Sequence, residues 1–108
     1  MRKDSREYRN EYDRFVLKLL IQNYYISRID LTKGIGLAPS YVREFYNGSR
    51  LLGYGALDKF ESIVFSLYAP LLENHAFELE QVSKILQSVE SEEELELFRL
   101  EGANAIDF

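Results

Sequence analysis

The chain has 108 residues, a hydrophobic fraction of 46% and a net charge of −5, which suits one globular domain with an ample core. It contains no cysteine, and this excludes a disulfide framework and a thiolate metal site. No apolar run reaches the roughly 18 residues that a membrane span needs. The charged residues 1–6 do not resemble a signal peptide. We therefore expect a cytoplasmic protein with no membrane partner.

The first predicted element is a long amphipathic helix over about residues 5–23. Its apolar residues recur at helical spacing and are Tyr8, Tyr12, Phe15, Val16, Leu19 and Leu20. The basic side chains of its opening turns either reach along a phosphate backbone as an arm or form intrahelical ion pairs. The basic residues are Arg2, Lys3, Arg6 and Arg9, and their candidate acidic partners are Asp4, Glu7, Glu11 and Asp13.

The second predicted helix is short and covers residues 28–35. Ser27 followed by Asp30 matches a capping box, which places the helix start at Arg28. Gly36 follows at the position where the chain must leave the helix. A left-handed residue there suits glycine, because glycine has no Cβ to clash.

The third predicted helix runs from Pro39 to about residue 46. Proline tolerates the first helical position, and Gly48 is placed to end the helix. Val42 and Phe45 are three residues apart, so they share the face that points inward. Leu37 is expected to enter the core between the two helices.

Residues 31–48, LTKGIGLAPSYVREFYNG, resemble the helix-turn-helix of the Cro and lambda-repressor-like family, also called the XRE family. Members commonly read roughly L-A-x-x-x-G-[LV]-S-x-S-Y-[IV]-S-x-[IFW]-E-x-G. The similarity covers about residues 12–68 and is most specific over residues 35–48. Two positions depart from the pattern: Thr32 replaces a smaller residue, and Ala38 replaces a capping serine. An ordinary αα-hairpin without a ligand is the alternative interpretation of the same two helices.

The remaining sequence predicts further helices and no strand. A fourth helix ends or kinks at Pro70, because proline lacks a backbone donor and clashes with the preceding turn. Another apolar stripe covers about residues 77–89, and Ser91 followed by Glu94 is a capping box for a final helix before Gly102. We expect an all-α fold, a lambda-repressor-like helix-turn-helix bundle with additional C-terminal helices. The expected core residues of the fourth helix are Leu57, Phe60, Val64, Leu67 and Tyr68.

The charge is divided between two parts of the chain. Residues 1–59 carry 11 Lys/Arg and 7 Asp/Glu, whereas residues 60–108 carry 2 Lys/Arg and 11 Asp/Glu. Phosphate contacts need local positive charge, so the negative total does not exclude DNA. We expect a DNA-binding domain at residues 1–70 and acidic C-terminal helices at residues 71–108. The latter either dimerise, bind a protein partner or complete the core of one subunit.

The resemblance implies sequence-specific binding of double-stranded DNA by a small, repressor-like transcriptional regulator, acting as a homodimer on a palindromic operator. Arg43 is the strongest candidate for reading a base, because a guanidinium donates two hydrogen bonds to guanine. The residues expected to read bases are Ser40, Arg43, Glu44 and Asn47. The residues expected to contact phosphates are Arg28, Lys33, Tyr41, Tyr46 and Arg50.

No pattern in the sequence indicates an enzyme, a cofactor or a metal site. The only histidine, His75, has no obvious ligand set, and no Gly-rich phosphate loop is present. A second hypothesis keeps the fold but assigns protein binding, as an anti-repressor or inhibitor of a phage or mobile element. An exposed Arg43 and Ser40 within a basic surface would favour DNA, whereas neutralisation by Glu44 and Asp30 would favour a protein partner.

Overall fold

In a computed structural model, residues 1–99 are described, apart from the side chain of Thr32, and all their regular secondary structure is helical. This confirms the all-α expectation for the described residues. None of the helices found there is both long and apolar enough to cross a membrane. The helices in chain order are α1 (Arg6–Tyr24), α2 (Arg28–Thr32), α3 (Pro39–Asn47), α4 (Tyr54–Leu67), α5 (Ala69–Glu73), α6 (Ala76–Ser88) and α7 (Glu92–Leu97).

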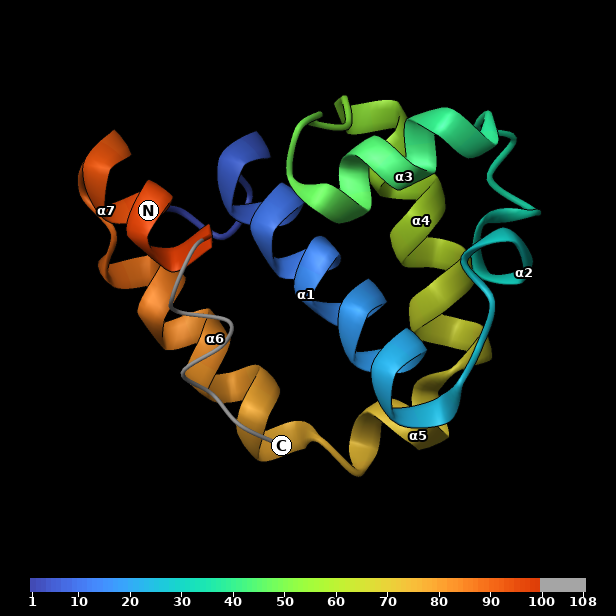
Figure 1. The fold of residues 1–108 in the computed structure, drawn as a ribbon. Helices are drawn as coiled ribbons and strands as arrows, with labels where there is room; N and C mark the ends of the chain where they lie inside the picture. Colours follow the sequence, from blue (N-terminus) through green and yellow to red (C-terminus); the bar gives the residue numbers. More distant parts are fainter. Residues whose placement is uncertain (100–108) are drawn as a thin grey trace.

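Helix α1 runs through the middle of the molecule. Figure 1 shows α3 and α4 on one side of it and α6 and α7 on the other. Its apolar residues Val16, Leu17 and Leu20 are fully buried. One hydrophobic cluster joins residues from both sides of the boundary predicted at residue 70, and that boundary falls inside α5. The helix that carries the centre of the core therefore also contacts the helices of the proposed site.

Helix α2 is shorter than the sequence predicted. It ends at Thr32 rather than at Ile35, and residues 33–36 form turns. Gly34 disfavours a helix and lies close to α4, since a Cβ on it would be 3.3 Å from Ile63 Cδ1. The Ser27 cap is confirmed, but its hydroxyl accepts from the N–H of Ile29 at 3.2 Å and not from that of Asp30.

Helix α3 begins and ends close to where the sequence placed it. Pro39 opens the helix, and Ala38 provides no side-chain cap. At the other end Gly48 is left-handed, with a φ of 84°, and its N–H donates to Phe45 O at 3.1 Å. Gly36 is also left-handed, with a φ of 80°, as expected for the turn before α3. Gly36 thus lies in the turn between α2 and α3, and Gly48 ends α3.

Helices α6 and α7 begin close to the predicted positions, whereas one predicted core residue at the end of α4 is exposed. Pro70 lies in the first turn of α5, where the chain breaks after α4. The hydroxyl of Ser91 accepts from Glu94 N–H at 3.2 Å, and the Glu94 carboxylate accepts from the N–H of residue 90 at 2.7 Å. Leu67 was expected in the core but is exposed. Gly102 and the rest of the tail lie outside the described residues.

Candidate nucleic-acid interface

A groove of about 390 Å³ lies between α2 and α3. Its polar lining comes from both helices and from the turn between them, while Val42 is buried beneath it. Because Val42 and Phe45 point into the core, the opposite side of α3 is left for solvent. The residues that line the groove are Arg28, Ile29, Lys33, Leu37, Pro39, Ser40, Val42 and Arg43.

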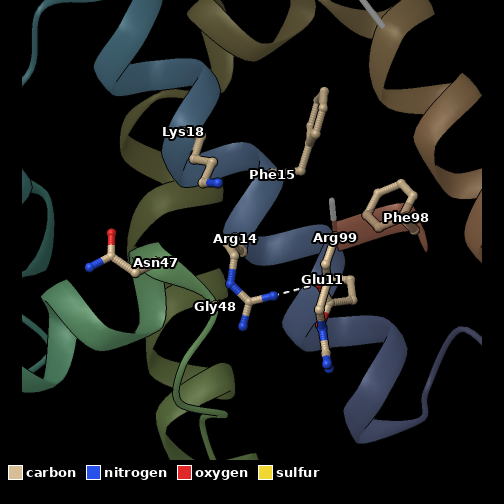
Figure 2. A pocket seen from close by; sticks show the side chains of 8 residues that line it. All are labelled: Glu11, Arg14, Phe15, Lys18, Asn47, Gly48, Phe98 and Arg99. Atoms are coloured by element: carbon tan, nitrogen blue, oxygen red, sulfur yellow. Dashed lines mark hydrogen bonds and ion pairs between the residues drawn. The ribbon is translucent and has the colours of Figure 1, made fainter. Parts of the chain in front are cut away.

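The four predicted base-reading residues do not form one cluster. Ser40 and Arg43 are exposed and line the groove, and Arg43 has no ion pair with any described residue. Asn47 is exposed at the other end of α3, where it borders a separate small cavity. Figure 2 shows its amide directed away from Arg14. The structure thus brings Ser40 and Arg43 together and places Asn47 and Glu44 elsewhere on the helix.

Glu44 forms an ion pair with Arg50 in the segment that follows α3. The guanidinium carbon of Arg50 also lies 4.5 Å from the centroid of the Tyr41 ring. The hydrogen bond from Arg50 to the Glu44 carboxylate raises the pKa of Arg50. Arg50 and Tyr41, both predicted to contact phosphates, thus contact each other, and Arg50 also pairs with Glu44, which was predicted to read a base. Glu44 offsets much of the charge that Arg50 would present to a phosphate.

Two cations lie against the ring of Tyr46 near the end of α3. The guanidinium carbon of Arg28 is 5.3 Å from the ring centroid, and Lys18 Nζ is 5.4 Å from it. Burial and the nearby Arg14 lower the pKa of Lys18. Lys18 was missed by the sequence reasoning, because its place in the long α1 gave no sign that it lies beside α3.

The other side of the α3 C-terminus is held by α1. Arg14 is buried, and its Nε donates to Phe45 O at 2.6 Å. Figure 2 shows its guanidinium turned toward Glu11, to which it donates a further hydrogen bond. Neither residue was expected in this role. The only available signal was two residues of opposite charge spaced three apart on one helix.

A basic arm was one of two alternatives for the start of the chain, and two of its arginines, Arg6 and Arg9, bond other parts of the fold. Arg6 Nε donates to the backbone oxygen of Leu52 at 2.9 Å. Arg9 donates to Asp58 at 2.6 Å and to Glu61 at 2.8 Å, both on α4. Neither alternative from the sequence describes these two residues, because Arg6 bonds the loop between α3 and α4 and Arg9 bonds α4. A local ion pair joins only Arg2 and Asp4 among those proposed for the described opening turns.

The described residues contain no group of three or more His, Asp or Glu that could hold a metal ion. His75 lies with its Nε2 2.8 Å from the hydroxyl of Tyr24. The two rings meet edge to face, with their centroids 5.7 Å apart. His75 therefore has a structural neighbour of its own in the contact between α1 and the start of α6.

Comparison with known proteins finds no matching family model, no matching curated protein and no matching solved structure.

Proposed function

We propose that this protein binds double-stranded DNA in a sequence-specific manner through α2 and α3, on a lambda-repressor-like helix-turn-helix fold. The observation that carries the proposal is the groove between these helices, which exposed Ser40 and Arg43 line together with Arg28 and Lys33. A hydrogen-bonding pair for base edges thus lies beside two cations for phosphates. In protein–DNA interfaces, phosphate contacts position the protein and base contacts specify the sequence.

The start of α3 adds a second supporting feature. The first amides of a helix lack intrahelical acceptors, and Ala38 supplies no side-chain cap for them. A phosphate oxygen is a suitable acceptor at this position, because the helix dipole favours negative charge there. The missing cap, unusual for the family that the sequence resembles, leaves this donor site open.

The proposed biological role is that of a small transcriptional regulator acting as a homodimer. Two copies would place their α3 helices about one turn of DNA apart, on a palindromic operator. Ser40 and Arg43 would read bases, and Arg28 and Lys33 would contact phosphates. Arg50 would contribute less, because it is paired with Glu44.

Selection of bound sequences from a random pool of DNA duplexes tests the proposal directly. Recovery of a palindromic consensus is the expected result, and failure to enrich any sequence would contradict it. Arg43→Ala should then weaken binding to the selected sequence by roughly 10-fold or more, with a smaller effect on unrelated DNA. Lys84→Ala, which removes the same charge from an ion pair on α6, serves as the matched control.

The salt dependence of the affinity is an independent check. Neutralising phosphates releases counterions, so the affinity should fall steeply between about 50 and 200 mM salt. Lys33→Ala should remove one phosphate contact and so reduce the slope of log affinity against log salt concentration by about 1. An affinity that does not change over this range would exclude the proposed contacts.

A second candidate function is binding of a protein partner by the same face. Ile29 is 62% exposed beside the groove, and the Glu44–Arg50 pair reduces the positive charge of the surface. An exposed aliphatic residue suits a protein interface better than a phosphate backbone. Ile29→Lys separates the candidates: it should preserve or strengthen DNA binding, whereas it should disrupt an apolar protein interface.

A further inference from the structure

The C-terminal turn of α3 is attached to α1 by one buried arginine. Arg14 Nε donates to Phe45 O at 2.6 Å, and its Nη2 donates to Arg50 O at 3.4 Å. The guanidinium carbon also lies 5.1 Å from the centroid of the Phe45 ring. A cation is favourable at this end of a helix, where the last carbonyl groups lack intrahelical donors. Arg14 therefore fixes both the end of α3 and the segment that follows it.

The carboxylate that holds Arg14 in place is shared with a second guanidinium. Glu11 is only 2% exposed, and its Oε1 accepts from Arg14 Nη1 at 2.5 Å. Its Oε2 accepts from Arg99 Nε at 2.9 Å. Figure 2 shows Arg14, Glu11 and Arg99 grouped beside Phe98. A buried charge must remain paired, so the position of each group depends on the other two.

Arg99 comes from the opposite end of the chain and follows Phe98, the residue that caps α7. Leu95 and Phe98 of this segment are buried in the core. A helix as short as α7 is not stable by itself, so its position is set by such contacts. The side chain of Arg99 is 22% exposed and lies 3.4 Å from Glu96. The ion pair with Glu11 thus links the C-terminal helix to the helix that supports α3.

We propose that Glu11 and Arg99 are positioning residues for α3, through which α7 sets the orientation of the DNA-reading helix. The effect on DNA rests on the proposed function above. Loss of Arg99 would leave Glu11 with a single partner and allow Arg14 to follow its carboxylate away from Phe45 O. Base contacts by Ser40 and Arg43 depend on the angle of α3. Phosphate contacts depend mainly on charge and tolerate small shifts.

The first test measures the ratio of affinities for a selected and an unrelated DNA duplex. Arg99→Gln should lower this ratio roughly 3- to 10-fold, the range expected for coupled neighbouring residues. Arg99→Lys should recover part of the loss, because it keeps a cation near Glu11. Lys84→Gln removes the same charge from an exposed pair with Glu80 and should leave the ratio unchanged. An equal loss of both affinities in Arg99→Gln would overturn the proposal.

Amide hydrogen exchange tests the coupling without DNA. The N–H groups of Gly48 and Ser49 donate to Phe45 O and Glu44 O at the end of α3. In Arg99→Gln these two amides should exchange faster, by more than any change at Phe60 and Val64 in the core of α4. Unchanged or uniformly raised exchange would overturn the coupling. If the wild-type protein enriches no DNA sequence, the proposed function fails and this measurement alone decides the coupling.

Discussion

Helix α1 buries two acidic residues, Glu11 and Asp13, whose surroundings differ sharply. Glu11 accepts hydrogen bonds from two guanidinium groups, those of Arg14 and Arg99. Asp13 is 1% exposed and lies on the side of α1 that faces α4, and its Oδ2 has no hydrogen-bond donor among the described residues. Burial, together with a hydrogen bond to Glu61, raises the pKa of Asp13 to about 10.

Both side chains are buried, so the difference shows that the available partners decide whether a buried carboxyl group is charged. The cation whose charge acts on Asp13 is Arg9, which is already bonded to Asp58 and Glu61. Asp13 therefore keeps its proton, which removes the cost of burying its charge. Glu11 serves instead as the centre of an ionic link that reaches α3. The two faces of α1 thus use buried polar groups in opposite ways.

Of the substitutions that test the difference between Glu11 and Asp13, Arg14→Ala should change the free energy of unfolding the most. The substitution removes the cation that bonds Phe45 O and leaves Glu11 with Arg99 alone. Breaking a buried pair in this way typically costs about 3 kcal/mol of the free energy of unfolding. Urea denaturation measures it, with Lys84→Ala as a control expected near zero. A loss below about 1 kcal/mol would mean that Arg14 does not hold α3.

Asp13→Asn should instead increase the free energy of unfolding, by an amount that depends on pH. The folded protein keeps the Asp13 proton up to about pH 10, whereas an unfolded aspartate loses it near pH 4. The contribution of Asp13 to stability is therefore full below about pH 4 and is lost as the pH rises toward 10. Asparagine does not titrate, so the stability of the variant relative to the wild type should rise by about 1.4 kcal/mol for each pH unit above about 4.

The comparison for Asp13→Asn is made by urea denaturation at several pH values. The advantage of the variant should shrink steadily toward pH 4. Parallel stability profiles for the two proteins would show that Asp13 is ionised in the folded state, and the contrast with Glu11 would disappear.

The smallest change in the free energy of unfolding is expected for Asp58→Asn. The Asp58 side chain is 70% exposed, and Arg9 retains its bond to Glu61 when Asp58 is neutralised. Exposed ion pairs of this kind contribute about 0.5 kcal/mol, which salt reduces further. Thermal unfolding at low and high salt checks the value. A loss above about 2 kcal/mol would indicate that Asp58 takes part in the accommodation of Asp13.

Local signals predicted the limits of several helices well. Ser27 and Ser91 mark helix starts and Gly48 marks a helix end that the structure confirms, because a cap depends on residues within a few positions of it. Gly36 has the left-handed conformation expected for the turn before α3. The predicted end of α2 was wrong: the helix stops at Thr32, before Gly34, which disfavours a helix and lies close to α4. The exposed Ser40 and Arg43 followed from the inward spacing of Val42 and Phe45.

The sequence by itself determined an all-helical chain, the positions of its caps and the outward face of α3, because short-range spacing governs all three. Only the tertiary structure decided the partners of the charged residues on α1. Arg6, Arg9 and Arg14 bond atoms between 31 and 52 residues away. A periodic pattern cannot predict partners so far apart in the sequence, since these pairs form only when the helices pack and buried charges require partners. For this reason the support of the proposed DNA-binding face became visible only in the folded chain.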